Sequence, residues 1–208
     1  MIRAALMAGG DYSPPRGDFD IYIGIDRGAL KLLEEGWQLD WAVGDFDSIS
    51  DAEFETIKHS GATLYSSSAE KDDTDTELAL KHLFAQYPQA EATLFGVFGG
   101  RMDHLLSNVF LPSDPELAPF MSQIHLADET NYISYLPQGK HTFQAQSEMT
   151  YLAFMTDDEA VLTILGAKYD LTAANYFKKK IYSSNESIGQ PITVVIPSGY
   201  VVVIESKD

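Results

Sequence analysis

The stretch ATLFGVFGGRMDHLLSNVF at residues 92–110 combines three local patterns that decide the fold. Residues 92–97 form a short apolar run, as in a buried strand. Gly99 and Gly100 follow as a turn, because a glycine pair interrupts both strand and helix periodicity. Apolar side chains then recur at helical spacing, at Leu105, Leu106, Val109 and Phe110. We therefore predict a strand, a tight turn and a helix, which together make one βα unit.

The same alternation extends through the first two thirds of the chain and is typical of βα units around a parallel sheet. Six strands are predicted there, at residues 2–8, 21–25, 41–43, 62–65, 92–97 and 123–127. Thr74 and Glu77 have the spacing of a capping box, so we expect a helix to begin at about Asp75. Arg101 and Asp103 should lie in the turn between the fifth strand and its helix.

The pattern changes after residue 137, where helical periodicity fades and β-type runs take over. Strands are predicted at residues 150–155, 160–164, 192–196 and 200–204, separated by turn signals such as Pro197-Ser198-Gly199. We therefore predict an α/β fold with two domains. Residues 1–137 would form a mostly parallel sheet flanked by helices, and residues 138–208 a small antiparallel β domain.

Composition limits the possible classes of function. The chain has 208 residues, 45% of them hydrophobic, which is enough to bury a full core. Its net charge of -17 argues against nucleic acid, whose binding needs many basic contacts, and favours a cationic small molecule. No apolar run approaches the roughly 20 residues that span a bilayer, so we expect a cytoplasmic protein without membrane contact. The absence of cysteine excludes disulfides, thiolate zinc sites and cysteine nucleophiles.

Asp45 and Asp47 directly follow a predicted strand, in Gly44-Asp45-Phe46-Asp47-Ser48. In extended backbone, residues two apart point to the same side, so both carboxylates can face one ion. Hard oxygen ligands with room for water and phosphate suit Mg²⁺ better than zinc or copper. A polar turn after a buried strand explains the same residues equally well, so this motif alone leaves both interpretations open.

Three more carboxylates, Asp72, Asp73 and Asp75, lie at the predicted start of a helix. Carboxylates there can cap free N–H groups and meet the positive end of the helix dipole, which is the simpler explanation for Asp73. Packed into four positions they also repel one another, and a bound cation would relieve this repulsion. Lys71 could reach a phosphate oxygen, although most exposed lysines are only solvated charges.

Glycine pairs end the first and fifth predicted strands, at Gly9-Gly10 and Gly99-Gly100. Each could be a tight βα turn, or a place where backbone N–H groups approach phosphate. Arg101 strengthens the second pair as a forked phosphate donor, and Asp103 adds a carboxylate. His104 lies beside them, but a lone histidine is more often a hydrogen-bonded structural group than a base.

In identity, order and spacing these motifs resemble the thiamine pyrophosphokinase family over essentially the whole chain. The resemblance rests on Gly44-Asp45-Phe46-Asp47-Ser48, Lys71-Asp72-x-Thr74-Asp75, Gly99-Gly100-Arg101-x-Asp103-His104 and Ser184-Asn185-Glu186. It implies an α/β domain, a C-terminal β-sandwich, and a homodimer whose thiamine sites lie between the nucleotide domain of one subunit and the β domain of the other. The implied reaction is Mg²⁺-dependent transfer of the pyrophosphoryl group of ATP to the hydroxyl of thiamine, releasing AMP.

The resemblance also implies roles for individual residues. Catalytic roles fall to Asp45, Asp47, Asp72, Asp75 and Asp103, with Mg²⁺ held by Asp45, Asp47 and Asp75. ATP binding falls to Asp26, Arg27, Gly44, Lys71, Thr74, Gly99, Gly100 and Arg101. Thiamine binding falls to Asp103, His104, Ser184 and Asn185. Two positions depart from the family's pattern: Ile25 replaces the usual alanine, and Asp170 stands where proline is frequent, which leaves that turn of the β domain open.

Two alternatives belong to other classes. Asp45-Phe46-Asp47-Ser48 also looks like the aspartyl-phosphate motif of haloacid-dehalogenase-type phosphatases. That motif normally closes the first strand, whereas here it follows the third, and no convincing later lysine and paired aspartates accompany it. The other alternative is a nucleotide or thiamine sensor with an inert site, which the presence of every acidic motif makes less attractive.

Overall fold

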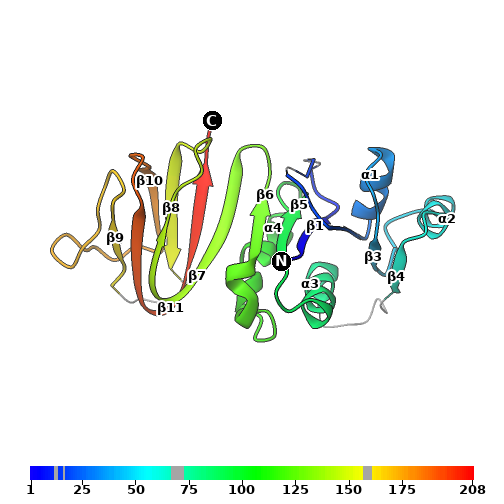
Figure 1. The fold of residues 1–208 in the computed structure, drawn as a ribbon, viewed down its shortest axis with the longest axis horizontal. Helices are drawn as coiled ribbons and strands as arrows, with labels where there is room; N and C mark the ends of the chain where they lie inside the picture. Colours follow the sequence, from blue (N-terminus) through cyan, green and yellow to red (C-terminus); the bar gives the residue numbers. More distant parts are fainter. Residues whose placement is uncertain (12–13, 16, 67–72, 157–160) are drawn as a thin grey trace. The chain divides into compact units, whose positions relative to one another are not determined.

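A computed structural model of the chain describes residues 1–208 except 12–13, 16, 67–72 and 157–160. The chain forms two compact units, Met1–Asp128 and Glu129–Asp208. The boundary predicted after residue 137 falls inside a strand, Asn131–Phe143, so the second unit begins earlier than the sequence pattern indicates. Figure 1 colours the chain along the sequence, and both units show the element types predicted for them.

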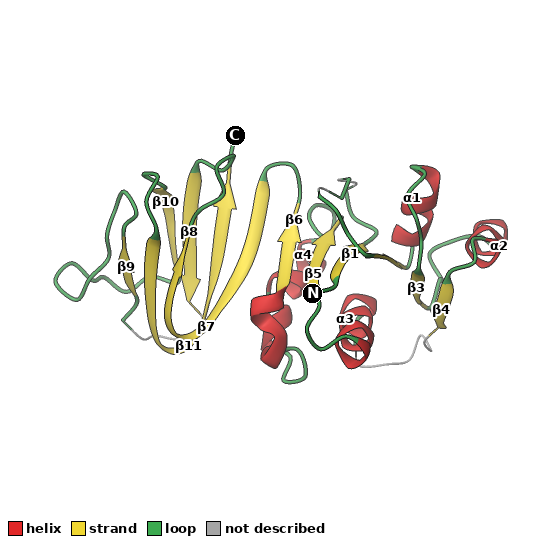
Figure 2. Ribbon diagram, in the orientation of Figure 1, coloured by secondary structure: helices red, strands yellow, loops and turns green. Residues whose placement is uncertain are grey.

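The first unit is built on a parallel sheet (Figure 2). Its strands in the described residues are β1 (Arg3–Met7), β2 (Ile21–Ile25), β3 (Trp41–Gly44), β4 (Thr63–Ser66), β5 (Glu91–Phe95) and β6 (Ile124–Ala127). They lie in the order β6-β5-β1-β2-β3-β4, and every neighbouring pair is parallel. All six predicted strands are present, with small shifts at their ends.

Helices connect these strands. They are α1 (Gly28–Glu34), α2 (Asp51–His59), α3 (Asp75–Gln86) and α4 (Met102–Val109), with 3-10 turns η1 (Leu111–Ser113) and η2 (Ala118–Gln123). The start of α3 at Asp75 is as predicted, because Thr74 and Glu77 form both halves of a capping box. Within the described residues, no helix combines the length and the apolar character that crossing a bilayer requires.

The order of strands reverses at β1. After β1 the chain adds β2, β3 and β4 on one side, and then adds β5 and β6 on the other, which makes β1 and β5 neighbours. In open parallel sheets ligands bind outside the carboxyl ends of the strands at such a reversal. The loops after β1 and β5 meet there, since the Gly10 amide donates to the Gly96 carbonyl at 2.8 Å and the Asp11 amide to the Phe98 carbonyl at 3.2 Å.

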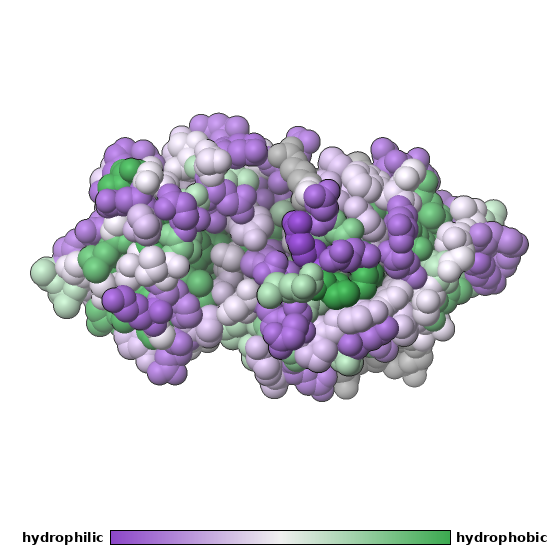
Figure 3. All heavy atoms as spheres, in the orientation of Figure 1, coloured by the Kyte–Doolittle hydropathy of each residue, from purple (hydrophilic) through white to green (hydrophobic). Residues whose placement is uncertain are grey.

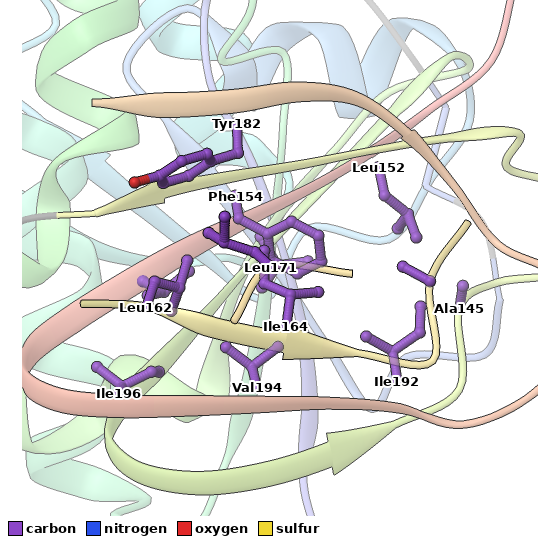
Figure 4. Packing of buried hydrophobic residues seen from close by; sticks show 13 residues of the cluster. Ala145, Leu152, Phe154, Leu162, Ile164, Leu171, Tyr182, Ile192, Val194 and Ile196 are labelled. Carbon is purple, nitrogen blue, oxygen red and sulfur yellow. The ribbon is translucent and has the colours of Figure 1, made fainter. Parts of the chain in front are cut away.

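The second unit is an antiparallel sandwich. Its strands in the described residues are β7 (Asn131–Phe143), β8 (Tyr151–Thr156), β9 (Thr163–Leu165), β10 (Ile181–Glu186) and β11 (Ile192–Ser206). The long antiparallel pair of β7 and β11 contributes to both layers, because residues 201–206 of β11 pair with β8, whereas residues 193–195 pair with β9. Buried side chains such as Phe154, Ile164 and Val194 fill the space between the layers (Figure 4).

The strands of this unit differ in part from the prediction. The runs at 192–196 and 200–204 belong to one strand, β11, and Pro197-Ser198-Gly199 is a shift in register, not a turn between strands. Opposite it, Pro137 and Gly139 interrupt the sequence pattern of β7, which was not predicted as a strand. Ser184-Asn185-Glu186, one of the motifs that carry the resemblance, lies at the end of β10.

Candidate active site

Four carboxylates gather at the carboxyl edge of the first unit's sheet. Asp26 follows β2, Asp45 and Asp47 follow β3, and Asp75 is the first residue of α3. Burial is the largest cause that raises the pKa of Asp26, and the charges of Asp75, Asp45 and Asp47 raise it further. A 2.7 Å hydrogen bond from the Ser48 hydroxyl to Asp26 Oδ2 opposes this shift. The structure thus brings the two segments that carry the predicted metal ligands together with the predicted ATP-binding residue Asp26.

Backbone geometry holds the ends of β2 and β3 close together. Asp26 and Phe46 both adopt left-handed backbone conformations, with φ of 51° and 59°, which are uncommon for side chains other than glycine. The Asp26 amide donates to the Val43 carbonyl at 2.8 Å. Gly44 has φ 151°, and a Cβ there would lie 3.3 Å from the Asp26 backbone. Gly44 therefore lets Asp26 approach the Asp45 turn, and its role in ATP binding stays a prediction.

Oδ1 of Asp26, one oxygen of this acidic group, is buried and accepts no hydrogen bond from the described residues. A buried acceptor without a donor is costly, and a cation would satisfy it. The donor set consists of carboxylate oxygens, which suits Mg²⁺. In the described part of the chain, no three acidic or histidine side chains are arranged to hold a metal by themselves, which fits an ion that keeps waters and shares phosphate oxygens.

Arg27 lies beside this group. Its guanidinium donates to the Ser48 carbonyl at 3.4 Å and lies 3.9 Å from Glu53, and its side chain is about half exposed. The Asp47 amide donates to Asp45 Oδ1 at 3.1 Å, which closes the turn after β3 and orients Asp45. Arg27 therefore places a positive charge next to the turn that follows β3.

Asp73, two residues before the start of α3, has a structural role and is not part of the acidic group. Asp73 pairs with Lys81 at 2.8 Å, and Lys81 also contacts Asp114 at 2.9 Å. Burial lowers the pKa of Lys81, but the hydrogen bonds with both aspartates outweigh burial and raise it. The negative charge of Asp73 is thus balanced by a lysine and needs no metal. Lys71 and Asp72, both predicted site residues, lie outside the described residues.

The loop after β5 is built from two left-handed glycines. Gly99 has φ +84° and Gly100 has φ +67°, and a Cβ on Gly99 would lie 2.1 Å from Asp11 Oδ2, so this position requires glycine. Arg101 Nε donates to Asp103 Oδ1 at 3.1 Å, and Arg101 Nη2 donates to Oδ2. These hydrogen bonds lower the pKa of Asp103.

Asp103 consequently differs from Asp45, Asp47 and Asp75. Its carboxylate is exposed and already paired with Arg101, and it is not one of the charges that shift the pKa of Asp26. His104 follows it in the first turn of α4 and is also exposed. Arg101 and Asp103 are therefore an exposed ion pair, which is worth little for stability in water and is available to be rearranged by a ligand.

The turn after β1 does not have the free amides that the sequence suggested for it. The N–H groups of Gly10 and Asp11 are used by carbonyls of the β5 loop. A Cβ on Gly10 would lie 2.4 Å from the Gly96 carbonyl oxygen, so this glycine serves close packing of the two loops. The opposite side of the turn contacts Lys31 of α1, whose Nζ donates to the carbonyls of Gly9 (3.0 Å) and Gly10. Sequence reasoning missed Lys31, because a single lysine in a helix carries no signal.

The second unit contains a cavity of about 680 Å³, a size suited to a small ligand. Ser184 and Asn185 both line it, together with Tyr169, Phe177 and Tyr182. The rings of Phe177 and Tyr182 meet edge to face, with centroids 5.5 Å apart. Two of the four residues predicted to bind thiamine, Ser184 and Asn185, thus share one pocket with several aromatic side chains.

Asn185 is tied into the backbone of this pocket. Its Oδ1 accepts from the amides of Tyr169 and Glu186, both at 2.9 Å, and its Nδ2 donates to the Tyr169 carbonyl at 2.8 Å. Ser184, in contrast, is exposed and has a left-handed backbone, with φ of 62°. Asp170 closes the turn that the sequence left open, because its Oδ1 accepts from the Gly166 amide at 2.8 Å. Asn185 therefore shapes the pocket, and Ser184 faces it.

Comparison with known proteins agrees with this arrangement. The model of the thiamin pyrophosphokinase catalytic domain matches residues 17–116, and that of the thiamin pyrophosphokinase vitamin B1 binding domain matches residues 140–201. A protein of Bacillus subtilis (strain 168) named thiamine pyrophosphokinase is 32% identical over 191 residues, which cover 90% of this chain and 88% of the relative. The chain belongs to the thiamine pyrophosphokinase family. This membership confirms the resemblance.

Solved structures of thiamine pyrophosphokinases extend the similarity to the fold. A family protein of Enterococcus faecalis is 40% identical, covers 99% of both chains and superposes with a TM-score of 0.93. The yeast thiamin pyrophosphokinase is only 13% identical, yet it superposes with a TM-score of 0.81 over 99% of this chain and 86% of its own. The predicted fold class, an α/β unit plus an antiparallel sandwich, is confirmed.

Proposed function

We propose that this protein catalyses the Mg²⁺-dependent transfer of the pyrophosphoryl group of ATP to the hydroxyl of thiamine, giving thiamine diphosphate and AMP. Family membership supports the choice of substrates. The observation that carries the proposal is the convergence of Asp26, Asp45, Asp47 and Asp75 at the carboxyl edge of the sheet. A group of carboxylates beside a strand-order reversal is suited to a metal–nucleotide complex, and none of these side chains is needed for the apolar core.

In this reaction the thiamine oxygen attacks the β-phosphorus of ATP in line. The new bond joins that oxygen to the β-phosphorus, and the bond from the β-phosphorus to the α,β-bridging oxygen breaks as AMP leaves. Catalysis of such transfers consists mainly of positioning the reactants and stabilising charge on phosphate oxygens. The hydroxyl proton must pass to a base, and we propose that an aspartate of the acidic group accepts it.

The proposed metal ligands are Asp45, Asp47 and Asp75, and bound Mg²⁺ would supply positive charge beside phosphate oxygens that these carboxylates alone would repel. Asp45 and Asp75 each have a local constraint. The amide of Asp47 fixes Asp45, and the capping box of Thr74 fixes the start of α3 and with it the backbone of Asp75. The predicted role of Thr74 in ATP binding is therefore indirect in our proposal.

We propose that the remaining predicted ATP residues act on the phosphates and the ribose. Arg27 and Arg101 are exposed guanidiniums that can give forked hydrogen bonds to phosphate. The left-handed Gly99 and Gly100 keep the loop after β5 free of side chains. Asp26 would accept through its unsatisfied Oδ1, either from the nucleotide or from a metal-bound water.

For thiamine, we propose the pocket that contains Ser184 and Asn185, with Asp103 and His104 contributed by an α/β unit. Thiamine has aromatic rings, and the aromatic side chains of Tyr169 and Phe177 that line this pocket suit such a ligand. We further propose a homodimer in the cytoplasm, in which each active site combines the α/β unit of one subunit with the β unit of its partner.

Product analysis tests this function. The purified protein incubated with thiamine, ATP and Mg²⁺ should form thiamine diphosphate and AMP in equal amounts, and chelation of Mg²⁺ should stop the reaction. Formation of ADP or free phosphate in place of AMP would contradict the proposal. Binding of both substrates without any product would favour the sensor alternative.

A further inference from the structure

The turn after β1 is bonded on both sides. The peptide group between Gly9 and Gly10 donates its N–H to the Gly96 carbonyl, and its carbonyl accepts from Lys31 Nζ at 3.0 Å. The next peptide group repeats the pattern, since the Asp11 amide donates to the Phe98 carbonyl and the Gly10 carbonyl accepts from the same ammonium. Two successive peptide planes therefore stretch between Lys31 and the β5 loop, and Lys31 fixes the direction in which their carbonyls point.

This arrangement matters for an anionic ligand. Without Lys31, two carbonyl oxygens would point together toward solvent beside the strand-order reversal and would repel a triphosphate. The ammonium covers both oxygens and replaces their partial negative charge with a full positive one. An ammonium has three donors, and in the described residues these carbonyls take two of them, which leaves one N–H for a ligand.

The surroundings of Lys31 favour an anion in that position. Lys31 is half-buried, and burial is the largest cause that lowers its pKa. The charges that act on it are the carboxylates of Asp11 and Glu34, which favour the ammonium, and the guanidinium of Arg27, which opposes it. A phosphate group would offset both the burial of the ammonium and the repulsion from Arg27.

We propose that Lys31 is an ATP-binding residue of this enzyme, which holds the carbonyls of Gly9 and Gly10 with two N–H groups and donates the third to a phosphate oxygen. This inference rests on the proposed function, because it takes ATP as the ligand of the α/β unit. A purely structural clip would leave the reactivity of the Lys31 ammonium toward a labelling reagent the same with and without ATP, whereas a phosphate contact would protect it. With a phosphate contact, removal of the Lys31 ammonium lowers the affinity for ATP and leaves the affinity for thiamine unchanged.

Titration of Mg-ATP into the full-length protein without thiamine tests this contact. Lys31→Met should weaken ATP binding by about tenfold, the loss expected for one charge-assisted hydrogen bond. The KM for ATP should rise by a similar factor, while the KM for thiamine stays the same. Lys31→Arg keeps the charge and should retain most of the affinity. Lys58→Met removes an exposed lysine of α2 and should bind ATP like the wild type.

A second measurement needs no variant, so it decides the matter even if Lys31→Met fails to fold. Acetylation of lysines in the wild-type protein, followed by mass spectrometry of its peptides, should show that Mg-ATP protects Lys31 and leaves Lys58 unprotected. Unchanged ATP affinity in Lys31→Met, or equal labelling of Lys31 with and without ATP, would overturn the inference. If the wild type makes thiamine diphosphate and AMP, either result removes only Lys31 from the site; if it makes neither, the proposed function itself fails.

Discussion

The two units present their polar site residues in opposite ways. At the edge of the α/β sheet, carboxylates from three segments face one another, and Oδ1 of Asp26 has no hydrogen-bond partner in the described residues. In the β unit, the amide of Asn185 is buried and makes three hydrogen bonds to backbone groups. A polar side chain without a hydrogen-bond partner in the protein adds little to the stability of the fold. A side chain that is hydrogen-bonded to buried backbone groups stabilises the fold directly. Substitution of the acidic residues in the first unit should therefore lower catalytic activity, and substitution of Asn185 should lower the free energy of unfolding.

The largest effect is expected at the acidic edge. Asp47→Asn removes one proposed metal ligand without creating a cavity, so turnover should fall by at least about a hundredfold. The midpoint of thermal unfolding should stay close to that of the wild type, because Asp47 is exposed. Asp51→Asn, at an exposed aspartate of α2, is the matched control and should keep full activity. Retention of activity by Asp47→Asn would place the site elsewhere.

Mixing two inactive variants tests whether each active site draws on both units from different subunits. Asp47→Asn disables the α/β unit, and Ser184→Trp should fill the pocket of the β unit. In a composite dimer, half of the sites in each mixed dimer have two intact contributors, and half of the dimers are mixed, so about a quarter of wild-type activity should return. No recovery, in a mixture shown by native mass spectrometry to contain mixed dimers, would mean that each site lies within one chain.

A smaller effect is expected in the β unit, where Asn185 and its neighbour Ser184 should differ in their contribution to stability. Asn185→Ala leaves the amide and carbonyl of Tyr169 and the amide of Glu186 without this partner, which should lower the free energy of unfolding by about 2–3 kcal/mol. Ser184→Ala should change stability little and raise the KM for thiamine. Urea denaturation of both variants measures the difference. Equal stability of the two would show that the amide of Asn185 does not hold the pocket.

The smallest effect concerns a buried carboxylate away from either site. Glu205 is only 3% exposed, and burial raises its pKa above the ordinary value of 4.5, opposed by a hydrogen bond from the Gln146 amide. Its contribution to stability is therefore full below the unfolded pKa and is lost as the pH rises through the folded pKa. Glu205→Gln should be more stable than the wild type at pH 8, and this gain should shrink toward pH 4.

Exposed Glu35→Gln is the control for this pair of measurements. The free energies of unfolding, measured in urea at several pH values, give the gain directly. A gain that is independent of pH would mean that burial of the Glu205 charge is not its cause.

The α/β fold could be predicted because its signals are local. Each strand of the first sheet is a short apolar run, and the start of α3 is written in the capping box of Thr74 and Glu77. The long antiparallel pairing of β7 with β11 could not be predicted in the same way. Pro137 and Gly139 interrupt the pattern of β7, and only its pairing with the shifted segment of β11 shows that the strand continues.

The same distinction applies to the site. Asp26, Asp45, Asp47 and Asp75 follow strands or begin a helix, so parallel strands place them at one edge. The sequence could not show that Asp103 is paired with Arg101, or that Asp73 is paired with Lys81, because those partners depend on side-chain geometry. Lys31 has no motif around it, and its position became apparent only from its bonds to the turn after β1.

The central claim is that carboxylates from separate segments form one cation site beside the nucleotide. Calorimetric titration of Mn²⁺ into the complex with a non-hydrolysable ATP analogue tests it directly, using Asp47→Asn, Asp75→Asn and the double variant. If both residues serve one site, each single variant should weaken Mn²⁺ binding, and the double variant should be little worse than either. Fully additive losses, or Mn²⁺ binding that neither variant affects, would contradict the account.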